Sequence, residues 1–313
     1  MKKTVALTLC LLILMFSSFS TSTFAAIIET KQLTIEEKEL VKEKKALREW
    51  CISNNIAKKF SPDTRAERVA ARRKILNEML SGEMEQTIGL EKLEELGVYV
   101  LESSLLSNNQ ILPLASPTVL SFNNVIVLYN SEDDVWELGG GLRWTDDAEW
   151  LSYVTNVGIP ENGNYNIGGL DGAGISLYST YGSYQSCALI DTSLYVSTGS
   201  GIKSTTTHAP TGSIDASRGV FHQFQDHVYC KENNFFSDDL LYYYGKHISV
   251  FAQYNAEFEN FHGKARLEYV HTWDTTTITS ISSQIGIDSV GFSYTFNNTS
   301  NQFVAYCPRE TIF

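Results

Sequence analysis

Hydrophobic residues follow three successive patterns along the 313-residue chain, and the first is an unbroken apolar run near the start. Two lysines precede this run, which extends from Val5 to Phe16 apart from Thr8 and Cys10, and small polar residues then lead to Ala25. This order predicts a signal peptide over residues 1–25, cut after Ala25 or Ala26. At about 12 residues, the run is shorter than the roughly 18 to 20 that a bilayer span needs. We therefore expect a secreted, extracellular protein with no stable membrane anchor.

The second pattern is helical and begins at the capping box Thr34-Ile35-Glu36-Glu37, whose hydroxyl and carboxylate can bind free amides at a helix start. Apolar residues then recur at helical spacing up to Cys51. A second helix is predicted from Thr64 to its stop at Gly82, and a shorter one from Met84 to Leu96. These helices define a charged helical region of residues 26–110.

The third pattern begins near Thr118, where short β-branched and aromatic segments alternate with glycine, asparagine and acidic residues. Alternation of apolar and polar side chains is clearest from Ala265 to Trp273. Strands are predicted at 119–129, 135–138, 141–144, 149–154, 175–178, 188–196, 247–258, 264–273, 275–285, 290–296 and 302–307. Strands without intervening helices indicate an antiparallel domain over residues 111–313. The fold class is therefore α+β, a helical region followed by an antiparallel β-sandwich, with a β-barrel as the alternative.

Charge separates these two regions. The formal net charge of the whole chain is -12, and loss of the signal peptide with its two lysines makes it -14. Lysine and arginine nearly balance the acids in residues 29–102, whereas residues 103–313 are sparsely charged and acidic. An acidic protein without a basic patch is repelled by phosphate backbones, so a nucleic-acid partner is not expected.

Four cysteines remain after the signal peptide, and an even number in an exported chain favours disulfides. Proximity and shared β context favour a Cys187–Cys230 bond. Cys51 and Cys307 form the second predicted pair. The alternative role, a catalytic thiolate, needs a positioned base, and no local motif marks one.

The first candidate site is the segment Trp144 to Trp150, in which Asp146, Asp147 and Glu149 lie between two indoles. Three carboxylates this close together could bind calcium through their oxygen atoms. They could also place acids beside indole rings on which a sugar stacks. The other interpretation is a solvated turn. No cofactor is expected apart from calcium.

Two further segments carry polar chemistry. The glycine-rich stretch Gly168 to Gly174 lacks the Lys-Ser/Thr of a phosphate loop, so Asp171-Gly172 is predicted to be a turn that leads into a strand. The stretch Phe221 to Cys230 holds metal-ligand residue types without a zinc signature. If this stretch is a strand, His222 shares a face with Asp226 and His227 lies on the opposite face, which argues against a shared metal.

Aromatic residues supply the predicted binding surface, because nearly all tyrosines and tryptophans lie in the β region. Such rings stack on sugars or anchor protein partners, although most are consumed by a sandwich core. Three consecutive rings cannot all face one core, so part of the Tyr242-Tyr243-Tyr244 run is expected at the surface. The predicted binding residues are Trp144, Trp150, Tyr242, Tyr243 and Tyr244.

The stretch Gly168-Gly169-x-Asp171-Gly172-x-Gly174-Ile175, with His271-Thr272-Trp273 and the strand Thr275 to Ser283, resembles a loose group of uncharacterised secreted β-rich proteins of Gram-positive bacteria. The resemblance concerns the C-terminal half of the chain and rests on short motifs. It implies a secreted, sandwich-like fold and assigns no activity or catalytic residue.

These patterns favour a secreted, non-catalytic protein that binds an extracellular glycan, cell-wall polymer or protein through its aromatic-rich β domain. The alternative is a secreted hydrolase with a helical pro-segment, using acids of 146–149 or the histidines of 222–227. A toxin or pore-former is a third possibility, because residues 275–296 alternate well enough for an inserting hairpin. The sequence does not specify the oligomeric state.

Overall fold

The computed structural model describes residues 34–105, 119–146, 163–178, 187–199, 204–207, 216–231, 240–283 and 291–313. Its α-helices are α2 (Ile35–Ser53), α3 (Arg65–Leu80), α4 (Gln86–Glu95) and α5 (Glu102–Leu105), with short 3-10 turns η2 (Ile56–Lys59), η3 (Pro62–Thr64), η4 (Ala216–Arg218) and η5 (Ala256–Asn260). Its strands are β1 (Val98–Val100), β2 (Leu120–Asn130), β3 (Val135–Trp144), β4 (Gly163–Tyr178), β5 (Leu189–Ser197), β6 (Ser204–Thr207), β7 (Gly219–Lys231), β8 (Leu240–Tyr244), β9 (His247–Tyr254), β10 (Lys264–Thr272), β11 (Ile278–Ser283), β12 (Phe292–Phe296), β13 (Gln302–Tyr306) and β14 (Thr311–Ile312).

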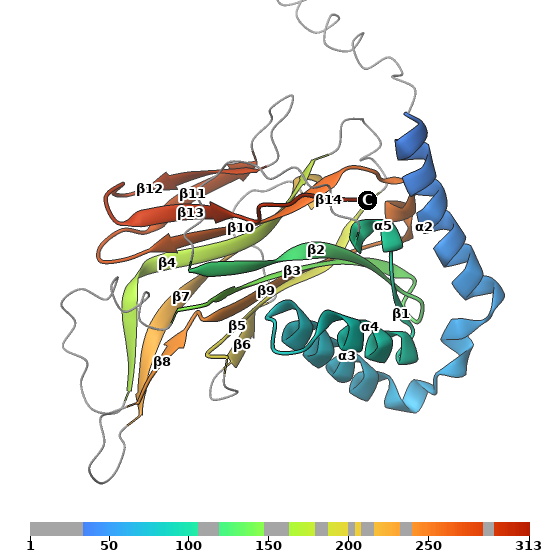
Figure 1. Cartoon of the computed structure of the whole chain (residues 1–313), viewed down its shortest axis with the longest axis horizontal. Helices are drawn as coiled ribbons and strands as arrows, with labels where there is room; N and C mark the ends of the chain where they lie inside the picture. The colour runs from blue at the N-terminus through green and yellow to red at the C-terminus, as the bar shows by residue number, and fades with distance from the viewer. Residues whose placement is uncertain are drawn as a thin grey trace, which may run out of the picture.

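The strands form two large antiparallel sheets and one small hairpin (Figure 1). The first sheet has the order β1-β2-β3-β9-β5-β6, and the second has the order β13-β10-β4-β7-β8, with β14 also paired to β10. The hairpin β11-β12 lies beyond the second sheet, and α3 and α4 lie beyond the first (Figure 1). The fold is therefore α+β, with a helical region followed by an antiparallel sandwich, as predicted.

Successive side chains of a strand point to opposite faces of its sheet, so a central strand contributes to a core on both sides. On β2, Val125, Val127 and Tyr129 face the second sheet and join the main core, whereas Ile126 and Leu128 face the helices. On β10, Ala265, Leu267 and Tyr269 join the main core, and Val270 packs beneath the hairpin. Both faces of the central strands are consequently buried, which a sequence of alternating apolar and polar residues does not reveal.

The predicted helices form at the expected places. The Thr34–Glu37 capping box has both of its bonds, Glu37 N to Thr34 Oγ1 at 3.2 Å and Thr34 N to Glu37 Oε2 at 2.7 Å. Gly82 and Gly97 follow the second and third helices with a φ of 78°, a left-handed conformation that favours glycine. The predicted helical region also contains β1, which pairs with β2, so this region contributes a strand to the first sheet.

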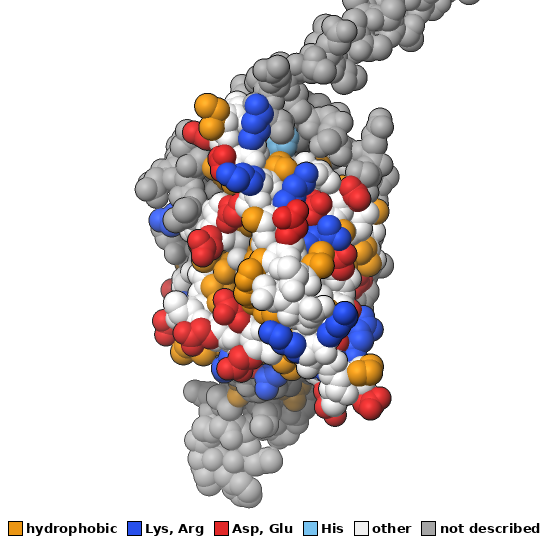
Figure 2. Space-filling model, turned by 90° about the vertical axis from the view of Figure 1, so that its right-hand side faces the viewer, with side chains coloured by type: hydrophobic (Ala, Val, Ile, Leu, Met, Phe, Trp, Pro, Cys, Tyr) orange, Lys and Arg blue, Asp and Glu red, His pale blue; other side chains and the backbone are white. Residues whose placement is uncertain are grey.

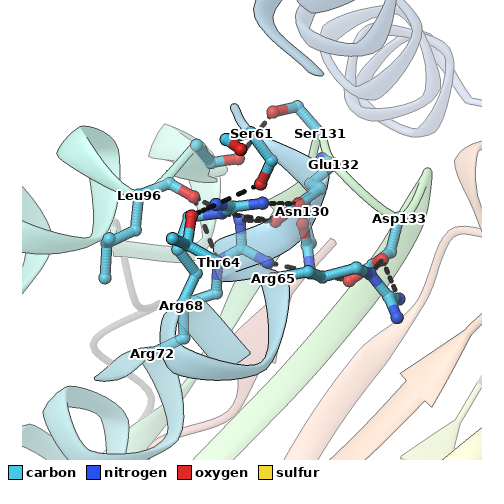
Figure 3. Close-up of polar contacts among 11 residues, drawn as sticks. Ser61, Thr64, Arg65, Arg68, Arg72, Leu96, Asn130, Ser131, Glu132 and Asp133 are labelled. Carbon is cyan, nitrogen blue, oxygen red and sulfur yellow. Dashed lines mark hydrogen bonds and ion pairs between the residues drawn. The ribbon is translucent and has the colours of Figure 1, made fainter. Parts of the chain in front are cut away.

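An arginine network fastens the helices to the turn between β2 and β3. Figure 3 shows Arg68 and Arg72 of α3 pointing toward the carboxylate of Glu132, which both bind. Arg65 pairs with Asp133, and Arg48 of α2 makes a two-bond contact with Asp134 at 2.7 and 2.8 Å. Arg68, chiefly through its hydrogen bond, and Arg72 hold the pKa of Glu132 below its ordinary value. The dense charges of the helical region thus have a specific acidic counterpart in the β region.

The face turned toward the viewer in Figure 2 carries Lys and Arg interspersed with Asp and Glu. No patch of a single sign stands out on this face, as expected for solvated helices with paired charges. Among the described helices, none combines the length and apolar character that a bilayer crossing needs.

Candidate functional site

Two places in the fold gather functional side chains, and the first is a buried polar cluster on the inner face of the second sheet. Three adjacent strands supply it: Asp171 from β4, Asp226 from β7 and His271 from β10. Val270 lies opposite Gly172 and Phe224 lies opposite Asp171, so the pairing of the strands brings the two carboxylates and the imidazole together. One ligand atom of each residue lies within 4.8 Å of the others.

Asp171 is held by four donors. His271 Nδ1 lies 2.8 Å from its Oδ2, which also accepts a bond from the Tyr269 hydroxyl at 3.0 Å. Its Oδ1 accepts from the Thr272 backbone N–H at 2.7 Å and from the Thr272 hydroxyl at 3.4 Å. Asp171 and His271 have no exposed surface, so these bonds replace water as the partners of a buried carboxylate.

Asp226 has much less support. Its Oδ2 accepts one bond from the Tyr243 hydroxyl at 3.0 Å and lies 3.8 Å from His271 Nδ1. Its Oδ1 is buried and has no hydrogen-bond partner among the described residues. Burial, and then the charge of Asp171, raise the pKa of Asp226 well above its ordinary value.

Aromatic rings close the cluster on the side of the first sheet. The Trp144 ring lies 5.3 Å from the His271 ring and 5.8 Å from the Tyr243 ring, both edge to face. Because every member of the cluster is buried, no solute can reach it in this conformation. Its chemistry is restricted to holding a proton or a cation.

The second place is a pocket of about 530 Å³ between the helices and β2. Its described apolar walls come from Met79, Leu80, Leu90, Leu105, Phe122, Ile126 and Pro308. Its polar lining consists of Gln86, Thr87, Ser104, Asn123, Asn124 and Arg309. This volume falls in the range of small-molecule sites, and the mixture of apolar walls with a few polar groups is typical of them.

A glycine on β3 positions one wall of this pocket. A side chain at Gly141 would place its Cβ 2.1 Å from Leu80 O, so only glycine allows the end of α3 to approach the sheet this closely. The same carbonyl accepts a hydrogen bond from Asn123 Nδ2 at 2.6 Å. Leu80 and Asn123 therefore stay fixed at the point where helix and strand meet.

Of the predicted aromatic binding residues, those that the structure describes do not form a surface platform. Trp144, Tyr243 and Tyr244 are buried, and they pack in the main core. Tyr242 is half-buried and stacks on Tyr229. Trp144, Tyr243 and Tyr244 therefore serve as packing residues of the sandwich interior, whereas a ligand contact of Tyr242 stays a prediction. Trp150 lies outside the described residues.

The predicted acidic site is only partly described. Asp146 is exposed just after β3, and Asp147 and Glu149 lie outside the described residues. The acids that the described residues do bring together are Asp171 and Asp226, far from this segment in the sequence.

Neither predicted disulfide is formed. Cys51, Cys187, Cys230 and Cys307 are all free thiols, and the first, third and fourth are buried. Cys187 precedes β5 of the first sheet whereas Cys230 lies on β7 of the second sheet. Burial raises the pKa of the Cys51 and Cys307 thiols to about 11, which disfavours the reactive thiolate form.

The prediction for the histidine strand is confirmed in its geometry. In β7, His222 and Asp226 are buried on one face, and the half-buried His227 stacks on Tyr244. His222 Nε2 lies 2.8 Å from Thr192 Oγ1 across the sandwich. The two histidine rings therefore lie on opposite faces of β7 and do not converge.

No local sequence motif marks the buried cluster as a site. Asp171-Gly172 was predicted to be a turn, but both residues lie inside the 16-residue strand β4. The signal that was present is the pair of short motifs around Asp171 and around His271, which the structure places side by side. Asp226 joins Asp171 and His271 only because β7 pairs with β4, and this pairing is not apparent from the sequence.

Comparisons with known proteins supply no family. No family model matches the chain, and no curated protein matches it. One solved structure, described as "AvmM Catalyzes Macrocyclization in Alchivemycin A Biosynthesis", aligns with 52% of this chain and 80% of its own at 6% identity. The TM-score of that alignment is 0.19, too low to support a statement about fold or function.

Proposed function

We propose that this chain is an exported, non-catalytic binding protein whose ligand occupies the pocket between α3, α4, α5 and β2. The observation that carries the proposal is the pocket itself, about 530 Å³ with apolar walls and a small set of amide and hydroxyl groups. Export rests on the apolar run and cleavage site of residues 1–26. This site replaces the aromatic surface that the sequence favoured, because the aromatic rings of that surface are largely buried.

The lining favours an amide-bearing unit of an extracellular glycan or cell-wall polymer. The side-chain amides of Gln86, Asn123 and Asn124 can donate to and accept from the amide groups of N-acetyl sugars or short peptides. Met79 and Leu90 offer apolar contact for acetyl or alanyl methyl groups.

Electrostatics restrict the ligand further. Arg309 is the only charged residue among the described lining residues, so the pocket accommodates one carboxylate at most. The chain as a whole has a formal charge of -12, which disfavours polymers with a phosphate on every unit. We therefore favour a neutral or singly anionic wall unit over a polyphosphate wall polymer.

The proposal is tested by measuring retention of the purified protein on isolated cell walls and on soluble wall fragments. Leu90→Trp fills the pocket with a larger side chain and is expected to weaken binding at least about 10-fold. Tyr242→Ala changes a half-buried ring on β8, away from the pocket residues, and is expected to bind like the unchanged protein. Thermal unfolding of each variant shows whether the fold is kept.

Two results would contradict the proposal. One is retention that Leu90→Trp leaves unchanged while Tyr242→Ala abolishes it, which would return the site to the aromatic strand. The other is the absence of binding to every wall fraction by a protein that is folded.

A further inference from the structure

The buried cluster on β4, β7 and β10 contains more negative charge than its described surroundings balance. Asp171 and Asp226 are both fully buried, and among the described residues neither has a Lys or Arg within ion-pair distance. The ion-pair partner of both is His271, which brings at most one positive charge. Two buried carboxylates with one imidazole leave an excess of negative charge in the interior, which is costly unless a cation or proton neutralises it.

The arrangement of donor atoms matches a metal site. His271 Nδ1 lies 2.8 Å from Asp171 Oδ2 and 3.8 Å from Asp226 Oδ2. Two ligand atoms at about 2.1 Å from a zinc ion are about 3.0 to 3.5 Å apart, depending on the angle between them. A cation between these three atoms therefore needs only small side-chain adjustments.

A second observation, independent of the cluster of acids, concerns the polar atom that has no partner. Asp226 Oδ1 is buried and accepts no hydrogen bond from any described residue, although Oδ2 of the same carboxylate contacts Tyr243 and faces His271. Buried carboxylate oxygens are normally satisfied, so an atom without a partner at this position points to a missing ligand.

We propose that Asp171, Asp226 and His271 bind one divalent transition-metal cation of the Zn²⁺ class in the interior of the sandwich. Nitrogen and carboxylate ligands suit this class, whereas calcium prefers oxygen ligands alone. Two hydroxyls offer further oxygen atoms beside the three ligands: Tyr269, 3.0 Å from Asp171 Oδ2, and Tyr243, 3.0 Å from Asp226 Oδ2. The cation joins three strands of one sheet, and its role is structural because no ligand atom is exposed.

A fully buried site acquires its ion as the chain folds. The test therefore unfolds the purified full-length exported protein in a chelator and refolds it with Zn²⁺, Mn²⁺, Ca²⁺ or chelator alone. After gel filtration, metal content and thermal unfolding are measured. The expected result is about one zinc per chain and a higher midpoint of unfolding after refolding with zinc, with no comparable effect of calcium.

Two variants separate this site from general effects of a buried charge. Asp226→Asn keeps the shape of the side chain and is expected to lower zinc affinity more than about 100-fold and to abolish the zinc-dependent shift in unfolding. Glu268→Gln is the matched control. Glu268 is an equally buried carboxylate on the opposite face of β10, where it accepts bonds from Tyr294 and the Phe292 N–H. The Glu268→Gln protein is expected to keep the full zinc content.

If the Asp226→Asn protein does not fold, metal binding by the unchanged protein is the test of the proposed site. Co²⁺ in place of Zn²⁺ is expected to give the visible absorption of a cation bound by nitrogen and oxygen atoms. The proposal is overturned if the refolded protein holds less than about a tenth of an equivalent of any transition metal and unfolds at the same temperature with and without zinc. A proton shared between the carboxylates would then neutralise the cluster. Binding of wall fragments tests the pocket separately, so either proposal can fail alone.

Discussion

Lys44 lies in the middle of α2 with no exposed surface, although lysine is among the residues least often found buried. Its ammonium donates a hydrogen bond to Leu40 O at 3.3 Å and lies 5.7 Å from the centre of the Phe313 ring. Burial lowers the pKa of Lys44 to about 7. The charged form of Lys44 is therefore destabilised in the folded chain. In the unfolded chain, the Lys44 side chain has its ordinary pKa.

The pKa of Lys44 predicts how stability depends on pH. Between about pH 7 and pH 10 the unfolded chain binds the Lys44 proton and the folded chain does not, so the free energy of unfolding rises with pH in this window. Lys44→Met is expected to stabilise the protein by about 2 to 4 kcal/mol at pH 7 and to remove this rise. Urea unfolding at several pH values measures both effects. Lys45→Met, one position along the helix, is the control and should leave the rise in place.

At the residue scale, the sequence shows which residues have aromatic or acidic side chains, but it does not show which of them are buried. Trp144 and Tyr243 are aromatic residues in a β region, and neither composition nor spacing separates a core ring from a surface ring. Asp171-Gly172 has the composition of a turn, but the strands on both sides bury it. The environment of such residues depends on contacts between strands that are far apart in the sequence, as for His271 and Asp171, which are 100 positions apart.

At the element scale, strand β3 shows the same limit. Its three glycines predicted two separate strands, yet Val135–Trp144 is continuous. Gly141 allows α3 to pack on the sheet, with Leu80 O only 2.1 Å from the position of a Cβ atom. The glycines reflect helix–sheet contact, and no local pattern distinguishes that cause from a strand break.

Gly141→Ala is expected to displace the end of α3 because its methyl group meets backbone. The expected cost is about 1 to 3 kcal/mol of stability, together with weaker ligand binding, since Leu80 lines the pocket. Gly140→Ala on the opposite face is the control, because its Cβ meets the movable Leu267 side chain at 3.3 Å. Equal losses in the two variants, measured by chemical unfolding, would contradict this explanation of the contact.

The arginine network predicts that acid loosens the helices first. The pKa of Glu132 is lowered in the folded chain, so its contribution to stability is present at neutral pH and is lost as the pH falls below about 4. Hydrogen exchange of α3 should therefore accelerate in acid before exchange of β9 and β10. Glu132→Gln should produce this opening at neutral pH. Asp133→Asn removes the partner of the exposed Arg65 and a longer ion pair with Arg72 at 3.7 Å, and should have a smaller effect.

At the scale of the whole molecule, the helices complete the fold. Leu76, Met79, Leu80 and Leu93 form one core with Ile126, Leu128 and Phe251 of the first sheet. β1 extends the same sheet at its edge. The Thr34–Glu37 capping box and the apolar spacing predicted the helices well because those signals are local, whereas the position of the helices on the sheet depends on contacts between distant segments.

If the chain is exported as proposed, this shared core predicts that the helical region is retained in the mature protein. Intact-mass analysis of the exported protein should give a product that begins at Ala26 or Ile27. A truncated chain that begins near residue 100 would expose Ile126, Leu128 and Phe251, and it is expected to aggregate or unfold. A stable, soluble natural product that begins near residue 100 would favour the hydrolase with a pro-segment.

The most direct test of ligand binding in the pocket uses its methionine. The chain beyond the predicted signal peptide contains two methionines, Met79 in the pocket lining and Met84 outside it. Labelled methionine methyl groups give one NMR signal each, and soluble amide-bearing wall fragments are titrated into the exported protein. The binding account predicts a saturable shift of the Met79 signal while the Met84 signal stays in place. Saturable binding that leaves the Met79 signal unmoved would contradict it.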